Sequence, residues 1–340
     1  MLTILLIFSI WHGFLSIFGI ISNCLLIYLS VFKSPKQIRV YATFIINFAF
    51  TDVVACFMDV FVAFRLVPSS NNFVLFYVFN GLCQFTGLNS CKIGLSILQH
   101  CIPHGLWSLF LSFFYRYHIL TNAGMRRRKI VLGLFLVYIP SLLQMLTFPF
   151  CLLDSEASIE MANQFLPNYN FTNSTSISVI DNVFSFSSMF TFSHICAPIF
   201  PLYILIFIMR RKIVSKLNES THLLSTETKA IHNQLLKCLT YQSLIPAIML
   251  ISVILYLLLQ FGIVLPNEII EYSIIPIWLL IPCFSPFTYI CFVRPYREVC
   301  KRNLVFCKKA KVASTQKTYR FESSAGFANG QKSQVSTIQC

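Results

Sequence analysis

The stretch SFFYRYHILTNAGMRRRK, from Ser112 to Lys129, fixes how the chain is oriented. An apolar run begins at Ile93 and ends at Arg116, which stands between two tyrosines, and a cluster of positive charge follows at residues 126–129. Cytoplasmic loops of membrane proteins are enriched in Lys and Arg. The stretch therefore predicts the cytoplasmic end of a membrane-spanning helix.

The composition of the whole chain favours helices in a bilayer. Hydrophobic residues make up 56% of the 340 positions and charged residues only 11%, whereas soluble domains carry about 25% charged residues. The apolar residues come in blocks long enough to cross the hydrocarbon core as helices with every backbone group paired. The predicted fold class is an all-α membrane protein, a seven-transmembrane helix bundle with the N-terminus outside and the C-terminus cytoplasmic. The predicted spans cover about residues 4–32, 41–66, 92–118, 130–152, 183–209, 238–262 and 269–293.

The distribution of basic residues decides the number of spans. With the N-terminus outside, all of the 26 Lys and Arg except Arg65 and Lys92 fall in cytoplasmic segments. An eighth span at Phe73–Asn89 would break this pattern, so we expect an outer loop or the lead-in to the third helix there. The net charge of +14 is thus a topology signal. Because it is dispersed over four loops, we expect contacts with membrane lipids and none with nucleic acid.

Three further segments are predicted around this bundle of residues 1–293. Residues 294–312 form a basic juxtamembrane segment able to be helical, and residues 313–340 form a disordered cytoplasmic tail, rich in Ser, Gln, Lys and Gly. The outer loop Leu153–Asn182 carries two acceptor sequons, at Asn170 and Asn173. We expect both to face the lumen, where they are candidate glycosylation sites.

Five of the 13 cysteines are candidates for chemistry. Cys91 and Cys151 lie at outer helix ends, in an oxidising compartment where a disulfide persists. We expect a bridge between them, with Cys83 competing for either partner. Cys300 and Cys307 follow the last span among basic residues, which suits reversible palmitoylation, and an ordinary buried cysteine is the alternative.

Polar residues within the spans mark candidate functional positions, because they are costly in a membrane. Asp52 lies in mid-span without a neighbouring cation in sequence. It is either a structural hydrogen-bonding hub or a functional site for an ion or a water molecule. His100 and His104 share the i, i+4 spacing of some zinc sites. A metal would need a third ligand, for which only His194, Asp52 and Asp59 are available. We therefore expect no metal and no cofactor, and we expect the two histidines to line a ligand cavity or to hydrogen-bond to a neighbouring helix.

Several short motifs occur along the chain, each in a different span. They are GIISN (Gly19–Asn23), NFAFTD (Asn47–Asp52), Cys91 with YRY (Tyr115–Tyr117), and SPFTY (Ser285–Tyr289). Together they resemble the signatures of rhodopsin-like seven-helix G-protein-coupled receptors. The segments SPKQIRVY, LSFFYRYHIL, QSLIP and FVRPYRE resemble more closely the nematode serpentine chemoreceptors of class delta. The resemblance covers about residues 15–300.

The resemblance implies a function and a set of residues. The expected function is a chemosensory receptor that binds a small extracellular ligand and activates a heterotrimeric G protein, in the plasma membrane or a sensory cilium. Tyr115 departs from the family, which usually has an acid there, and no tryptophan precedes Pro246. The implied coupling residues are Arg116, Tyr117 and Tyr289, and the implied intramembrane polar hub is Asn23, Asp52 and Ser285, the last in place of the usual asparagine.

Other interpretations remain open from the sequence. Arg116 is either the coupling residue or a topology anchor whose charge reaches the interface, as residues 126–129 are. A transporter is a second class, although its repeated halves are not found between residues 1–150 and 180–300. A seven-span metal hydrolase would have to complete the pair His100 and His104. We expect a receptor and no enzyme.

Overall fold

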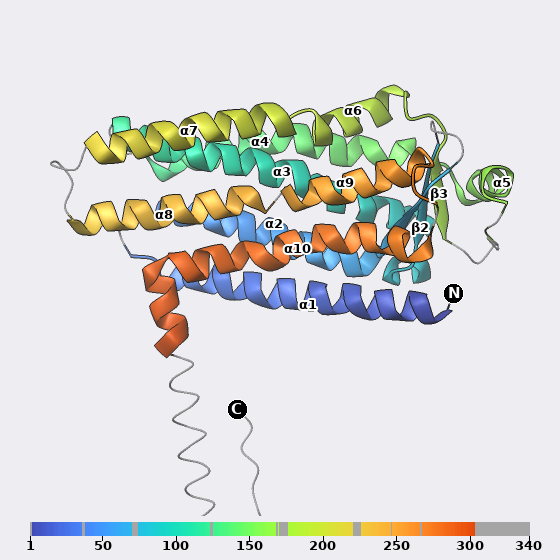
Figure 1. Ribbon diagram of the computed structural model, residues 1–340, viewed down its shortest axis with the longest axis horizontal. Coiled ribbons are helices and arrows are strands. Elements are labelled where there is room, and N and C mark those ends of the chain that lie inside the picture. The colour runs from blue at the N-terminus through green and yellow to red at the C-terminus, as the bar shows by residue number, and fades with distance from the viewer. Residues whose placement is uncertain are drawn as a thin grey trace, which may run out of the picture. The chain divides into compact units, whose positions relative to one another are not determined.

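The chain folds into a membrane bundle of long helices (Figure 1). The structure, a computed structural model, describes residues 2–35, 38–69, 74–122, 125–167, 169, 176–219, 226–245, 247–265 and 267–302. Residues 1–296 form one compact unit and residues from Arg297 onward a second. The helices of the bundle are α1 (Leu2–Phe32), α2 (Ala42–Val62), α3 (Leu88–Thr121), α4 (Arg127–Thr147), α6 (Phe186–Cys196), α7 (Ile199–Glu219), α8 (Thr226–Leu244), α9 (Ala247–Gln260) and α10 (Glu268–Phe292).

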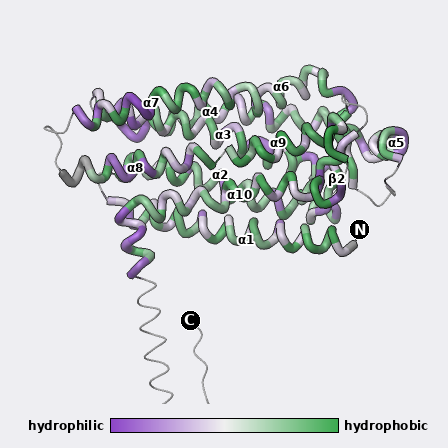
Figure 2. Tube along the Cα trace, viewed as in Figure 1, coloured by the Kyte–Doolittle hydropathy of each residue, from purple (hydrophilic) through white to green (hydrophobic). Residues whose placement is uncertain are grey.

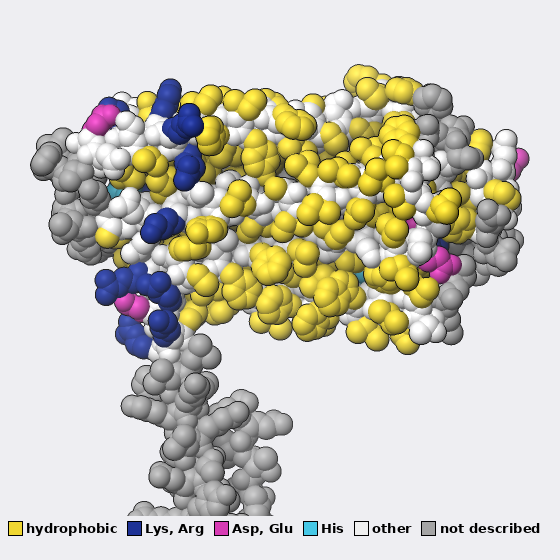
Figure 3. All heavy atoms as spheres, viewed as in Figure 1, with side chains coloured by type: hydrophobic (Ala, Val, Ile, Leu, Met, Phe, Trp, Pro, Cys, Tyr) yellow, Lys and Arg dark blue, Asp and Glu magenta, His cyan; other side chains and the backbone are white. Residues whose placement is uncertain are grey.

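These helices make seven spans over the described residues, because α6 with α7 and α8 with α9 each form one interrupted span. Six spans are long and apolar enough to cross a membrane by length and composition alone, and α3 is not among them. Hydropathy is high along most helices and falls at the far end of α7 (Figure 2). Hydrophobic side chains cover the middle of the bundle, and Lys and Arg gather over the end of α7 (Figure 3). The predicted seven-helix membrane fold is confirmed.

Helix α3 is the central element of the bundle. It contacts α2, α4, α6, α7 and α8, and its 34 residues continue through Pro103 without a break. Many of its polar side chains are buried, among them Lys92, Gln99 and Arg116. A helix surrounded by other helices can carry such residues because its neighbours supply hydrogen-bond partners. This is why α3 lacks a stretch as apolar as those of the other six spans.

Two spans are interrupted near their middle. In the fifth, α6 ends at Cys196 and α7 begins at Ile199, with Pro198 and Pro201 at the start of the new helix. Proline lacks a backbone N–H, so it is tolerated in the first turn of a helix and disrupts the interior. In the sixth, α8 ends at Leu244 and α9 begins at Ala247. The sequence predicted each of these spans as a single block.

A small antiparallel sheet of β1 (Phe64–Val67), β2 (Leu75–Phe79) and β3 (Ile177–Ile180) covers the outer end of the bundle (Figure 1). Helix α2 ends at Val62, and Ala63 turns the chain with a positive φ of 35°. The expected second span, 41–66, was therefore too long at its outer end. The segment Phe73–Asn89 is not a span, since its described part holds β2 and a short 3-10 helix at Leu82–Phe85.

The two faces of β2 pack on different partners, as alternation along a strand requires. Leu75, Tyr77 and Phe79 belong to the apolar core of the bundle. Phe76 and Val78 pack instead against the short outer helix α5 (Ser155–Phe165). The sheet and α5 thus form a two-layered cover over the outer end, which we call the outer cap.

Candidate functional site

A series of polar side chains runs along α3 with a spacing of four residues. Its seven members are all buried and are Lys92, Ser96, His100, His104, Ser108, Ser112 and Arg116. Four residues advance an α-helix by 40° beyond a full turn. The series therefore winds around α3 and meets different neighbours along its length.

The partners change in order from the outer end to the inner end. The Lys92 ammonium donates to the Leu152 carbonyl at 2.9 Å and to Asp154 at 3.0 Å. Ser96 donates to a backbone carbonyl of α4. Lower down, Asn47 of α2 donates to Ser108 at 3.1 Å. The polar series fixes α3 against α4 in the outer half and against α2 further in.

His100 and His104 belong to this series and do not line the cavity described below. Their rings lie 5.7 Å apart, and both contact the ring of Tyr138 on α4 edge-on. His104 Nε2 also lies 3.3 Å from Asn47 Oδ1. Of the two alternatives expected for these histidines, the structure shows contacts with neighbouring helices, since both lie on the side of α3 that packs on α4 and α2. Among the described residues, no group of three His, Cys, Asp or Glu side chains could hold a metal.

Arg116 ends the series at the inner end and is only 2% exposed. Its Nη1 donates to Nδ1 of His232 on α8 at 3.1 Å, so that nitrogen of His232 must be unprotonated. The guanidinium also lies over the ring of Tyr41, 4.3 Å from its centroid. Nε and Nη2 have no hydrogen-bond partner among the described residues. Arg116 is thus held inside the bundle by an aromatic ring and a neutral imidazole, and it forms no ion pair with a carboxylate of the described residues.

The two other predicted coupling residues lie on either side of Arg116. Tyr289 on α10 is fully buried, and its hydroxyl makes a 2.5 Å hydrogen bond with Gln242 on α8. Tyr117 is half-buried and faces α7, where the Lys212 ammonium lies 5.7 Å from its ring centroid. Tyr289 therefore contacts the inner half of the sixth span, and Tyr117 contacts the inner half of the fifth.

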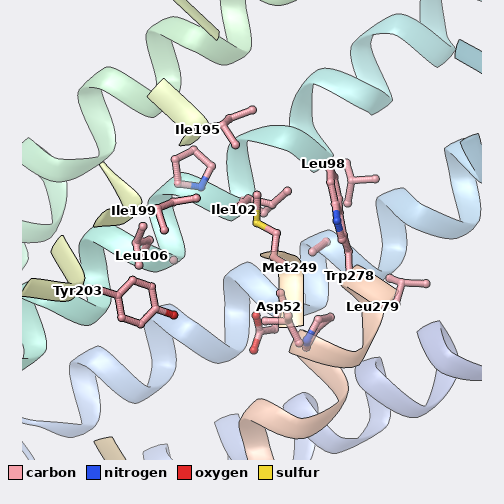
Figure 4. A pocket seen from close by; sticks show the side chains of 16 residues that line it. Asp52, Leu98, Ile102, Leu106, Ile195, Ile199, Tyr203, Met249, Trp278 and Leu279 are labelled. Atoms are coloured by element: carbon pink, nitrogen blue, oxygen red, sulfur yellow. The ribbon is translucent and has the colours of Figure 1, made fainter. Parts of the chain in front are cut away.

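A cavity of about 110 Å³ lies on the other side of α3, in the middle of the bundle. Its lining comes from α2, α3, α6, α7, α9 and α10. Ile195, Ile199, Leu106 and Tyr203 form one side of it, as Figure 4 shows. The other side includes Leu98, Met249, Trp278, Leu279 and Asp52. Asp52 is the one carboxylate among otherwise largely apolar lining residues.

The predicted polar hub of Asn23, Asp52 and Ser285 is assembled around α10. Asn23 Nδ2 donates to the carbonyls of Gly19 and Pro282, each at 2.9 Å, and so joins α1 to α10. Ser285, three residues beyond Pro282, interacts with the Asp52 carboxylate. Oδ2 of Asp52 and Oδ1 of Asn23 are buried without a hydrogen-bond partner among the described residues. Asn23 of α1 and Asp52 of α2 thus interact with α10 about one turn apart, at Pro282 and Ser285.

Sequence reasoning missed two buried pairs in the outer half, a histidine with an aspartate and an arginine with a glutamate. His12 Nδ1 lies 2.8 Å from Asp59 Oδ2, which joins α1 to α2. Arg65 Nη1 on β1 lies 3.6 Å from Glu271 Oε2 on α10. A polar residue in a span always needs a partner, so Asp59 signalled a pair, but its partner is 47 positions away.

Tyr169 completes the second pair from the outer loop. Its hydroxyl donates to Glu271 Oε1 at 2.5 Å, and the Arg65 guanidinium lies 4.5 Å from the ring centroid of Tyr272. Burial, together with the hydrogen bond to Glu271, raises the pKa of the Tyr169 phenol well above its ordinary value. This cluster attaches the outer cap and the outer loop to α10.

The disulfide of the outer end joins Cys83 to Cys91, with a Cα–Cα distance of 5.0 Å. The expected bridge from Cys91 to Cys151 was wrong, and the competing Cys83 is the actual partner. The 3-10 helix that holds Cys83 leads directly into α3, and Gly87 turns the chain between them with a φ of 102°. Cys151 is in no disulfide, and its thiol points to the Thr147 carbonyl.

The remaining predicted modification sites fall largely outside the described residues. Asn170, Asn173 and Cys307 are there, as is the predicted tail 313–340. Residues 294–302 are helical, and Cys300 is half-buried in that helix. Cys300 therefore stays a predicted palmitoylation site.

Comparison with known proteins relates this chain to one receptor family. The family model for Serpentine type 7TM GPCR chemoreceptor Srd matches residues 8–302. Serpentine receptor class delta-19 and class delta-18 of Caenorhabditis elegans are each 44% identical over 300 residues, which cover 88% of this chain and 88% of each relative. Serpentine receptor class delta-3 of the same organism is 32% identical over 287 residues, 82% of both chains.

A solved structure resembles the same architecture. Squid rhodopsin superposes with a TM-score of 0.57 at 16% identity, over 88% of this chain and 85% of that chain. At this identity the likeness concerns the fold alone. The family matched by the sequence is one of receptors and not of enzymes. The resemblance expected from the motifs is confirmed: the chain belongs to the Srd family of serpentine seven-transmembrane chemoreceptors.

Proposed function

We propose that this receptor binds a small molecule in the cavity between α3 and α10 and signals through a heterotrimeric G protein at its inner end. The plasma membrane, in particular that of a sensory cilium, is the proposed location. The observation that carries the proposal is the position of the cavity. It lies beside the interruptions of both broken spans, whose inner halves reach the contacts of Arg116.

The interruption of the fifth span borders the cavity directly. Ile195 is in the last turn of α6 and Ile199 is the first residue of α7, and both line the cavity. In the sixth span, Met249 lines the cavity from the first turn of α9. A helix end lacks the continuous hydrogen bonds that stiffen a helix. A ligand in the cavity therefore touches the points at which α7 and α8 are free to tilt.

The inner halves of these spans carry the partners of the coupling residues. α8 holds His232 against Arg116, and Gln242 against Tyr289. Tilting α8 breaks the contact of Arg116 and opens the inner end for a partner protein. Binding thus shifts an equilibrium between two packings, and it can do so only by favouring one of them. We infer that the described arrangement, with Arg116 enclosed, is the resting one.

The experiment compares signalling with surface expression in cells that produce the full chain. Arg116→Ala should remove the second-messenger response to a ligand panel and leave surface expression and ligand binding unchanged. Arg116→Lys should also signal poorly, because a point charge lacks the planar fork of donors. Arg128→Ala is the matched control, since Arg128 is exposed at the same end of the bundle.

Two results would contradict the proposal. Arg116→Ala that signals normally excludes the coupling role. Loss of surface expression in Arg116→Ala with rescue in Arg116→Lys identifies the arginine as a topology anchor.

A further inference from the structure

The cavity offers a ligand one unengaged polar group. Tyr203 donates its hydroxyl to a carbonyl at 2.9 Å, and Trp278 donates its indole N–H to a serine hydroxyl. The Cys101 thiol donates to a carbonyl of its own helix at 3.3 Å. Asp52 Oδ2 alone is left without a hydrogen-bond partner among the described lining residues. A ligand with two or more polar groups would leave all but one unsatisfied, at a cost in affinity.

We propose that the cavity is built for a small monoamine with an otherwise apolar body, bound through an ammonium to Asp52. The proposal rests on the function above, in which this cavity is the ligand site. An ionised carboxylate away from water is costly unless a cation accompanies it, and no Lys or Arg is among the described lining residues. A ligand ammonium supplies that charge and a charge-assisted hydrogen bond, which is about twice as strong as a neutral one.

The rest of the lining suits the apolar body of such a ligand. Leu106, Ile195 and Ile199 line one side of the cavity and the indole of Trp278 lies on the other, as Figure 4 shows. An apolar cavity of about 150 Å³ accommodates benzene, so the smaller cavity of about 110 Å³ suits a short branched chain. Larger molecules and molecules with several hydroxyl groups are excluded.

Three probes of nearly equal shape separate the polar group from the apolar body. They are isobutylamine, isobutanol and isopentane, which differ in whether one terminal heavy atom is nitrogen, oxygen or carbon. Binding of tritiated isobutylamine to the purified full-length receptor is measured directly, and the other two probes are used as competitors. We expect the amine to bind about tenfold more tightly than the alcohol, because its hydrogen bond is charge-assisted, and isopentane to bind more weakly still.

Two variants locate the amine at this cavity. Gly105 lines the cavity, and a Cβ added there meets nothing within 4 Å, so Gly105→Leu fills the space without a backbone clash. It should abolish binding of all three probes. Gly13→Leu is the matched control, since a Cβ at Gly13 on α1 also meets nothing and this residue does not line the cavity. Asp52→Asn keeps the shape and should reduce the preference for the amine over the alcohol to about twofold or less.

Failure of this inference is distinct from failure of the proposed function. Equal affinity for amine and alcohol, no binding of any probe, or amine binding that survives Gly105→Leu each overturns the monoamine assignment. So does protection of the ligand-free receptor against heat by sodium chloride but not by potassium chloride, which would make Asp52 a sodium site. Ligand-evoked signalling without preference for amines would leave the receptor function intact. Selective amine binding without any second-messenger response would support the assignment and contradict the signalling role.

Discussion

The two ends of the bundle treat buried charge in opposite ways. At the outer end, Arg65 faces Glu271 and His12 faces Asp59, each within 4 Å of a carboxylate oxygen. At the inner end, Arg116 is equally buried, but an imidazole and a tyrosine ring hold it. Removing one partner of a buried ion pair leaves an uncompensated charge, whereas a cation held by neutral groups can be released at small cost. The outer end is therefore built to stay as it is, and the inner end to change.

This comparison can be tested by the apparent free energy of unfolding in detergent, and the largest effect is expected at Arg65 and Glu271. Glu271→Leu should destabilise the receptor by about 3–5 kcal/mol, because Arg65 is then buried without a counter-charge. The double variant Arg65→Leu with Glu271→Leu should recover most of the loss. Glu268→Leu, one turn earlier on α10, is the control and should cost about 1 kcal/mol or less. An equal loss in all three variants would contradict the role of the pair.

The disulfide should give the second largest effect. Cys83 and Cys91 are 8 residues apart, and closing a loop of this length contributes about 2.5 kcal/mol by restricting the unfolded chain. Cys83→Ser and Cys91→Ser should each show this loss, and Cys151→Ser should not. Mass spectrometry of unreduced peptides checks the pairing. A peptide that links Cys91 to Cys151 would refute the structural assignment.

A carboxylate placed beside Arg116 should make the inner end resemble the outer one. His232→Glu should stabilise the receptor by about 1.5 kcal/mol, because hydrogen bonds to charged groups are stronger than neutral ones. The same variant should lower basal and ligand-evoked signalling several-fold, measured at equal surface expression. His118→Glu adds the same charge to the last turn of α3 and is the control. Unchanged signalling in His232→Glu would remove α8 from the coupling route.

The smallest effect on stability is expected from removing the inner arginine. Arg116→Met replaces a buried cation whose Nε and Nη2 lack hydrogen-bond partners among the described residues. Losing such a group should change the free energy of unfolding by about 1 kcal/mol or less, in either direction. Thermal unfolding of the purified variant measures it. A loss of 3 kcal/mol or more, on the scale expected for Glu271→Leu, would erase the contrast between the two ends.

The sequence predicted the number, order and orientation of the spans because local composition determines which segments enter lipid. It did not reveal the strands of the outer cap, since a run such as LFYVF at residues 75–79 is too short and apolar to distinguish a strand from the end of a helix. The contact of Arg116 with His232 joins positions 116 residues apart and depends on how α3 and α8 are rotated.

The polar series on α3 can be recognised in the sequence. A polar residue at every fourth position from Lys92 to Arg116 indicates a helix enclosed by others on all sides. For His100 and His104 this pattern favours contact with neighbouring helices, which was one of the two expected alternatives. The apolar positions between members of this series, such as Leu98, Ile102 and Leu106, are then left to line the cavity.

Because the sixth span is interrupted, a small rotation at the interruption would produce a larger displacement at the inner end of α8. His232 lies 12 residues from Leu244, where α8 ends, and this corresponds to an arm of about 18 Å. A rotation of about 5° at the interruption displaces the imidazole by about 1.6 Å, which is enough to separate two atoms that now form a hydrogen bond of 3.1 Å. A ligand in the cavity that rotates α8 by only a few degrees would thus break the contact between His232 and Arg116.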